Sequence, residues 1–202
     1  MKRIAICGNI ASGKSTVQKI LEEKGYKVLD TDEVSKKLLT VNNKELYDGF
    51  KNYDVFENGE FSRFKVAQLI FSDEEARLKI ASIMHPQIAE EIKIFFDANQ
   101  SDDLLFVGIP LLFESNMQSL FDKIIFVYTD DGIRLERLLK RNNYTIEHAK
   151  SRINSQMPQE DKVKLSDYVI NNNGDFGETH KIVYIPQTYL NRLTDEGEKT
   201  SL

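Results

Sequence analysis

Short apolar runs typical of β-strands alternate with helical patterns along this chain of 202 residues. After the first run, Val17, Ile20 and Leu21 follow the i, i+3, i+4 spacing of an amphipathic helix, and Gly25 stands where a helix C-cap is expected. Strands that alternate with helices indicate an α/β fold, in which helices cover both faces of a parallel sheet. The predicted strands are Ile4–Cys7, Val28–Leu29, Leu104–Ile109, Ile124–Tyr128 and Tyr168–Ile170.

The segment between the second and third predicted strands is too long for a simple crossover connection. Residues 72–75, Ser-Asp-Glu-Glu, have the form of a capping box that opens a helix, and His85-Pro86 predicts a kink or break farther along it. We interpret residues from about 32 to 103 as a helical insert.

A second excursion follows the fourth predicted strand. The pattern predicts a helix from about Asp131 to Lys140, a polar turn at Asn142-Asn143 and a further helix capped by Thr145. A small lid is expected here, at about 131–159. The chain is therefore interpreted as a single domain over residues 1–202, with a tail at about 194–202 that is predicted to be disordered. The predicted core comprises residues of about 1–31, 104–130 and 160–193.

Composition narrows the class of protein. The proportions of 41% apolar and 29% charged residues are ordinary for a globular protein, and the net charge of −5 argues against bulk attraction to nucleic acid or to an anionic membrane. The single cysteine, Cys7, cannot form an internal disulfide, and no apolar segment is long enough for a signal sequence or a membrane span. We therefore expect a cytoplasmic protein, with Cys7 buried in the first strand and without a nucleophilic role.

Residues 8–15, Gly-Asn-Ile-Ala-Ser-Gly-Lys-Ser, match the phosphate-loop pattern G-x-x-x-x-G-K-[ST] between a strand and a helix. Gly8 and Gly13 permit a backbone that curls its N–H groups around an anion, while the following helix presents its N-terminus. Lys14 would neutralise charge between the β- and γ-phosphates, and the Ser15 hydroxyl would ligate Mg²⁺. A chance glycine turn is the alternative. The residues of this segment expected to bind ATP are Gly8, Ala11, Ser12, Gly13, Lys14, Ser15 and Thr16.

A phosphate loop alone does not separate kinases from GTPases, transport ATPases or proteins that only bind a nucleotide. The guanine-reading pattern N-K-x-D has its nearest match at residues 43–46, Asn-Lys-Glu-Leu, which lack the aspartate. Asp30 and Asp32 stand at the end of the second predicted strand, on the edge of a parallel sheet where ligands bind. We favour Asp32 as a group that orients an acceptor hydroxyl and receives its proton, the alternative being an N-cap for the next helix.

Arg134, Arg137 and Arg141 are spaced at i, i+3 and i+7 on the helix that leads to the predicted lid, and should project to one side. Arginine stabilises the dispersed charge of a transferring phosphoryl group well. A solvated helix face is the alternative, which Glu136 and Lys140 suit. We favour a catalytic role for Arg141 and keep Arg137 as a candidate nucleotide-binding residue, whereas Arg134 fits the solvated face better.

Together these blocks resemble the dephospho-CoA kinase family. Residues 8–17 resemble its phosphate loop, and residues 28–32 resemble its D-A-D segment, whose second aspartate is the family's proposed base. The His85-Pro86 block and residues 110–114, Pro-Leu-Leu-Phe-Glu, are the specific part of the resemblance, which extends from Ile4 to Gly174. The other matching blocks are residues 61–63, 70–72, 137–141, 152–156 and 168–174.

The resemblance implies a three-layer P-loop fold like that of nucleoside-monophosphate kinases, with a five-stranded parallel sheet, a helical acceptor-binding insert and a small lid. It implies transfer of the γ-phosphoryl group of ATP, with Mg²⁺, to the 3′-hydroxyl of dephospho-CoA, and we expect a monomer. Lys14, Asp32 and Arg141 would be catalytic, while Arg137 and Asn173 would contact the nucleotide. The residues expected to bind the acceptor are Asp32, Arg63, His85, Pro110 and Leu111.

Three positions depart from the family pattern. Asn9 and Ala11 stand where glycines are common, at variable positions of the general motif, so we expect both to be tolerated. Gly108 stands where many members carry aspartate, so Mg²⁺ would depend on Ser15, the phosphates and water. A nucleoside-monophosphate kinase remains an alternative, although residues 107–111 lack the arginine of its D-G-[FY]-P-R pattern. A regulatory nucleotide binder without turnover is the other alternative.

Overall fold

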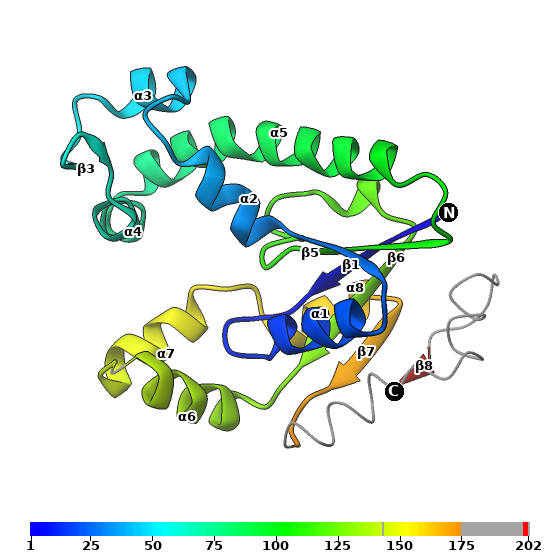
Figure 1. Cartoon of the computed structure of the whole chain (residues 1–202). Helices are drawn as coiled ribbons and strands as arrows, with labels where there is room; N and C mark the ends of the chain where they lie inside the picture. The colour runs from blue at the N-terminus through cyan, green and yellow to red at the C-terminus, as the bar shows by residue number, and fades with distance from the viewer. Residues whose placement is uncertain (143, 175–199, 202) are drawn as a thin grey trace. The chain divides into compact units, whose positions relative to one another are not determined.

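The computed structural model describes residues 1–142, 144–174 and 200–201 (Figure 1). The chain divides into two compact units, one formed by Met1–Leu29 with Asn99–Leu202 and the other by Asp30–Ala98. The second unit comprises most of the predicted insert.

The first unit contains a sheet with the strand order β2-β5-β1-β6-β7-β8. The pairs β1/β5, β1/β6, β6/β7 and β7/β8 are parallel. The predicted α/β fold and its five-stranded parallel sheet are confirmed. The two-residue β8 adds to that sheet, within a tail that was expected to be disordered and that otherwise lies outside the described residues. The strands are β1 (Lys2–Cys7), β2 (Lys27–Asp30), β5 (Leu104–Gly108), β6 (Lys123–Tyr128), β7 (Tyr168–Asn171) and β8 (Thr200–Ser201).

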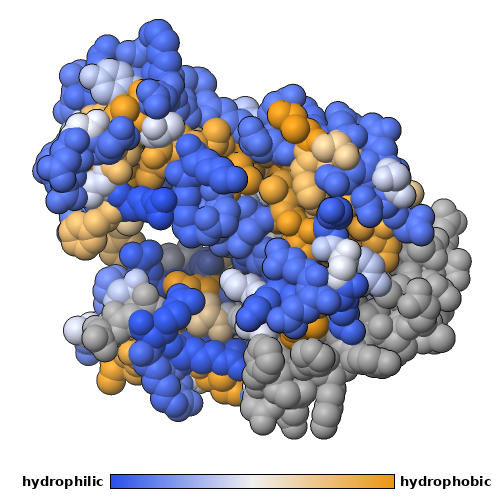
Figure 2. Space-filling view, in the orientation of Figure 1, coloured by the Kyte–Doolittle hydropathy of each residue, from blue (hydrophilic) through white to orange (hydrophobic). Residues whose placement is uncertain are grey.

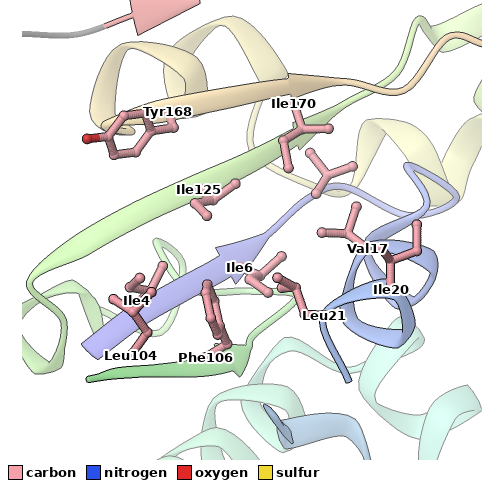
Figure 3. Close-up of a cluster of buried hydrophobic side chains, with 11 residues drawn as sticks. Ile4, Ile6, Val17, Ile20, Leu21, Leu104, Phe106, Ile125, Tyr168 and Ile170 are labelled. Carbon is pink, nitrogen blue, oxygen red and sulfur yellow. The ribbon is translucent and has the colours of Figure 1, made fainter. Parts of the chain in front are cut away.

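The core of this unit lies between the sheet and helix α1 (Lys14–Glu23) (Figure 3). The side chains of Ile4 and Ile6 pack there with Val17, Ile20 and Leu21. The helix ends as predicted: the N–H of Gly25, whose φ is +87°, donates to the Glu22 carbonyl (2.9 Å). The Tyr26 N–H donates to the Leu21 carbonyl (3.1 Å), which completes a Schellman motif.

Both faces of the central strand are covered. Successive residues of β1, from Ile4 to Cys7, are buried, although their side chains point to alternate faces. Continuous burial of this kind is expected of a parallel strand in a three-layer α/β fold.

Helices follow β6 as the sequence predicted. They are α6 (Asp131–Asn142), α7 (Ile146–Asn154) and α8 (Gln159–Leu165), and the short 3₁₀ helix η1 (Gln118–Leu120) precedes β6. Thr145 caps α7 by accepting from the His148 N–H (3.2 Å). Leu138 of α6 packs with Ala149 and Ile153 of α7. A polar turn was predicted at Asn142-Asn143. Asn142 instead belongs to the last turn of α6, and Asn143 lies outside the described residues.

The second unit is mainly helical. Helix α5 packs against α2, α3 and α4. Strands β3 and β4 form an antiparallel hairpin that was not predicted, and its turn residues Asn58 and Gly59 both have positive φ angles (51° and 83°). The elements are α2 (Thr31–Leu38), α3 (Lys44–Phe50), β3 (Phe56–Glu57), β4 (Glu60–Phe61), α4 (Arg63–Ser72) and α5 (Glu74–Ala98).

Two local predictions for this unit are corrected by the structure. The break that His85-Pro86 offered as one possibility does not occur. Helix α5 continues through Pro86, because loss of one backbone hydrogen bond is outweighed by apolar burial on both sides of it, at Ile83 and Ile88. The capping box beginning at Ser72 does not form. Ser72 belongs to α4, and it is the Asp73 carboxylate that accepts from the Ala76 N–H (2.9 Å).

Figure 2 shows hydrophilic residues over most of the visible face of both units. Within the described part of the chain, none of the helices combines the length and hydropathy needed to cross a bilayer.

Candidate active site

The phosphate loop connects β1 to α1, and close packing requires glycine at both glycine positions of its motif. A Cβ on Gly8 would meet the Ser12 side chain and lie 2.9 Å from the Val127 carbonyl oxygen. Gly13 has a φ of +94°, and a Cβ there would overlap the Asn172 side-chain amide. Ala11 also has a positive φ, 63°, so the loop tolerates alanine at this position only in a conformation that costs an L-residue free energy.

Neighbouring elements hold the loop from outside. The Ser12 carbonyl accepts from Asn172 Nδ2 (2.7 Å) and from Thr129 Oγ1 (2.9 Å). The Ile10 N–H donates to Gln156 Oε1 (2.7 Å). The N–H groups of Thr16 (2.9 Å) and Val17 (3.2 Å) donate to the Gly13 carbonyl, which starts α1 directly at the end of the loop. The loop held in this way therefore meets the positive N-terminus of the helix, where anions bind.

Lys14 is the first residue of α1, and only 7% of it is exposed. Its ammonium donates to Gln18 Oε1 (2.9 Å), one helical turn farther along. Ser15 is exposed and Thr16 is half-buried beside it. A buried cation and an exposed hydroxyl therefore stand together at the positive end of the helix dipole.

The arginines of α6 do not share one environment. Arg137 donates to the carbonyls of Ala11 (3.4 Å) and Asn172 (3.0 Å), and Arg134, which is 2% exposed, donates to the Ile10 carbonyl (3.5 Å). The solvated-face alternative is thus wrong for both residues. Arg141 lies exposed in the last turn of α6.

The loop after β7 completes the surroundings of the phosphate loop. Asn173 Oδ1 accepts from the Asp130 N–H (2.8 Å), and Arg137 also donates to the Gly174 carbonyl (3.3 Å). Arg137 therefore connects the phosphate loop to the loop after β7, in which Asn173 lies.

Pro110 and Leu111 follow β5. Pro110 is half-buried and Leu111 is exposed, so Leu111 is available to an apolar part of a ligand. Nearby in the chain, Glu114 Oε1 lies 2.7 Å from Nζ of the fully buried Lys162. Sequence reasoning assigned no role to this ion pair, which joins the β5–β6 connection to α8.

The remaining candidates lie in the second unit. Asp32 is the second residue of α2 and is exposed, while its N–H donates to Asp30 Oδ1 (2.9 Å). Asp30 is therefore the N-cap, and the capping alternative for Asp32 was wrong. Arg63, the first residue of α4, is exposed, and His85 is half-buried in α5, where desolvation lowers the pKa of its imidazole.

Cys7 has the environment expected of it. Burial raises the pKa of its thiol to about 12, and Sγ lies 3.6 Å from the Ile125 carbonyl oxygen. A thiol with that pKa is not a nucleophile near neutral pH.

Sequence reasoning missed several residues that support the loop. Gln18, Thr129 and Asn172 were given no role. Thr129 and Asn172 directly follow β6 and β7, so the rule that ligands bind at the carboxyl ends of parallel strands could have found them. Gln18 is one helical turn from Lys14, which is a weaker signal.

Comparison with known proteins is consistent across sequence and structure. A family model described as dephospho-CoA kinase matches residues 2–178. A dephospho-CoA kinase of Listeria monocytogenes is 39% identical over 95% of this chain and 97% of its own length, and one of Carboxydothermus hydrogenoformans is 39% identical over 88% and 89%.

Two solved structures are also similar. One, from Thermus thermophilus, has a TM-score of 0.81 and 31% identity, covering 96% of this chain and 98% of its own. A dephospho-CoA kinase from Campylobacter jejuni has a TM-score of 0.69 and 26% identity over the same proportions. A shikimate kinase from Acinetobacter baumannii, at 15% identity and a TM-score of 0.58, shares the fold.

Proposed function

The chain belongs to the dephospho-CoA kinase family, and we propose that it transfers the γ-phosphoryl group of ATP to the 3′-hydroxyl of dephospho-CoA. The products are coenzyme A and ADP. The phosphate loop is the observation that carries this proposal. In a chain of this family, hydrogen bonds with Asn172, Thr129 and Gln156 fix the loop in one shape.

The donor half of the reaction needs positive charge where the phosphates lie. The N-terminus of α1 and the Lys14 ammonium supply it, and burial of Lys14 strengthens its interaction with an anion. Arg137, which donates to the Ala11 carbonyl of the loop, and Asn173, which accepts from the Asp130 N–H, are the proposed nucleotide contacts. Arg141, in an exposed position, is proposed to reach the transferring phosphoryl group when the lid residues close.

Magnesium fits the residues that are present. Mg²⁺ commonly takes one or two protein ligands and completes its octahedron with phosphate oxygens and water. The exposed Ser15 hydroxyl is suited to that part, and the described residues contain no cluster of three or more His, Cys, Asp or Glu side chains that could form an all-protein cage. When bound, the ion would neutralise phosphate charge, and Ser15 would hold it.

The acceptor half requires a base. We assign this role to Asp32, whose carboxylate is exposed and is not the helix cap. The acceptor oxygen forms a bond to the γ-phosphorus, the bond to the β,γ-bridging oxygen breaks and ADP leaves, while Asp32 takes the hydroxyl proton. Arg63, His85, Pro110 and Leu111 are the proposed contacts of the acceptor.

An ADP-release assay with and without dephospho-CoA tests the proposal, with coenzyme A identified by mass spectrometry. We expect ADP release to depend on dephospho-CoA. Release that depends instead on AMP would indicate a nucleoside-monophosphate kinase. ATP binding without release in either mixture would indicate a regulatory binder. Light scattering on the same sample tests the expected monomer.

A further inference from the structure

Gln18 is a buried polar residue in an otherwise apolar part of α1. Only 4% of it is exposed, and its neighbours Val17, Ile20 and Leu21 form the face that packs on the sheet. A buried amide is costly unless its atoms are hydrogen-bonded. Its Oε1 accepts from the Lys14 ammonium (2.9 Å), so the residue serves the phosphate loop rather than the apolar core.

Gly108, the last residue of β5, provides the space for this side chain. A Cβ on Gly108 would overlap the Gln18 amide nitrogen and would lie 2.5 Å from Cδ and 2.9 Å from Oε1. Even an alanine at this position would therefore displace the amide. Because Gln18 is buried, that displacement would move the oxygen that holds Lys14.

We propose that Gln18 is a positioning residue for Lys14, and that Gly108 lacks a side chain in order to admit it. This inference deepens the proposed function and rests on it. The lysine side chain has several rotatable bonds, and ordering it at the moment of reaction would cost entropy. A hydrogen bond to Gln18 orders the ammonium in advance.

The chemistry of an amide suits this task. An ammonium has three N–H donors, so one can remain on Gln18 while the others reach phosphate oxygens. The amide is neutral and does not itself offset the positive charge of Lys14, whereas a carboxylate at the same place would offset it. Gln18 thus fixes the position of the cation without weakening its field.

Gln18→Ala is the first test. We expect kcat to fall about 10-fold, the scale of a hydrogen bond to a charged group, with the Kd for a non-hydrolysable ATP analogue changed less than about threefold. Affinity for ADP with aluminium fluoride, which mimics the transferring phosphoryl group, should fall about as much as kcat. Glu22→Ala, at an exposed position on the same helix, is the matched control and should leave all three quantities unchanged.

A double-mutant cycle tests the role of Gly108. Gly108→Ala should lower kcat about as much as Gln18→Ala, because both remove the oxygen from Lys14. In the Gln18→Ala background, Gly108→Ala should have little further effect, since no amide remains to be displaced. Gln18→Glu, which keeps the length of the side chain, should also lower kcat, whereas a purely packing role would tolerate it.

Three results would overturn the inference. They are a wild-type kcat in Gln18→Ala, tighter binding of the ATP analogue by that variant, or additive losses in the cycle. Tighter binding would show that Gln18 competes with phosphate for Lys14. The aluminium fluoride measurement needs no acceptor turnover, so it still decides the matter if dephospho-CoA proves not to be the substrate.

Discussion

The polar residues around the phosphate loop and the polar candidates of the Asp30–Ala98 unit are arranged in opposite ways. Around the loop, Lys14 and Arg134 are almost fully buried. Lys14 donates to Gln18 of its own helix, and Arg134 donates to the Ile10 carbonyl of the loop. In the other unit, Asp32 and Arg63 are exposed at the first turns of their helices. The surroundings of the phosphate loop are therefore preorganised, whereas the Asp30–Ala98 unit presents these two charged side chains to solvent.

The difference follows from the free energy needed to remove each charged group from water. A buried cation requires hydrogen-bonding partners, so a preorganised phosphate site requires a supporting network in the fold itself. An exposed carboxylate remains hydrated until a substrate covers it, and the fold does not depend on it. Substitution of an exposed candidate of the Asp30–Ala98 unit, such as Asp32 or Arg63, should therefore change activity and spare stability, while substitutions of the buried residues around the loop should change both.

Asp32→Asn should show the largest separation of activity from stability. It removes the charge that accepts the hydroxyl proton, so kcat should fall on the order of 10²–10⁴-fold. Thermal stability should stay within about 1 kcal/mol of wild type, because Asp32 is not the N-cap and asparagine keeps the size of the side chain and one oxygen acceptor. The measurements are steady-state kinetics with dephospho-CoA and thermal unfolding.

Asp30→Ala is its matched control. Loss of the N-cap oxygen should cost about 1 kcal/mol of stability, while turnover stays within a few-fold of wild type. If Asp32→Asn turns over dephospho-CoA within a few-fold of wild type, the assignment of the base is wrong.

Lys14→Ala should lower turnover at least ~100-fold, because one preorganised electrostatic group is lost from the transition state. The variant should remain folded, and circular dichroism checks this. Lys19→Ala removes a cation that is mostly exposed on the same helix and should behave as wild type. Near-normal turnover in a folded Lys14→Ala protein would contradict the proposed role.

Two arginines on α6 allow the comparison to be made within one helix. Arg141→Ala should lower kcat about 10-fold, the scale of one charge-assisted hydrogen bond, with less effect on ATP binding in the absence of acceptor and little on stability. Arg134→Ala should cost about 1–3 kcal/mol of stability, because it removes a buried side chain bonded to Asp131 Oδ1 (2.6 Å) and to the Ile10 carbonyl. Equal losses of ATP binding and kcat in Arg141→Ala would argue against a transition-state role.

Much of the fold could be predicted from the sequence. Buried parallel strands are continuous apolar runs, and caps such as Thr145 and Gly25 depend on one residue and its immediate neighbours. The phosphate loop was equally local, since its motif lies within nine residues. In each case the sequence signal is local, although the shape of the phosphate loop also depends on hydrogen bonds with Thr129, Gln156 and Asn172, which are distant in the chain.

The sequence predictions failed where the structure depends on contacts between residues far apart in the chain. Pro86 stays inside α5 because the helix is held by apolar packing along its length, and Gln18 matters because Gly108, ninety positions away in the chain, makes room for it. The hairpin at Asn58-Gly59 is different. Asn-Gly is a strong turn signal, and it was overlooked because the flanking strands are only two residues each.

Ala11→Gly should have the smallest effect, and its sign is informative. Alanine with a φ of 63° costs about 1–2 kcal/mol relative to an unstrained backbone, and glycine removes that cost. Two terms oppose the gain: glycine loses about 0.5–1 kcal/mol more chain entropy on folding, and the Ala11 methyl packs against the cluster around Leu138. We therefore expect stability between unchanged and about 1 kcal/mol higher by urea unfolding. Ala89→Gly, inside α5, is the matched control and should lose about 1 kcal/mol. If both substitutions destabilise equally, the strain at Ala11 does not contribute measurably, and the loop is as tolerant of alanine as the sequence alone suggested.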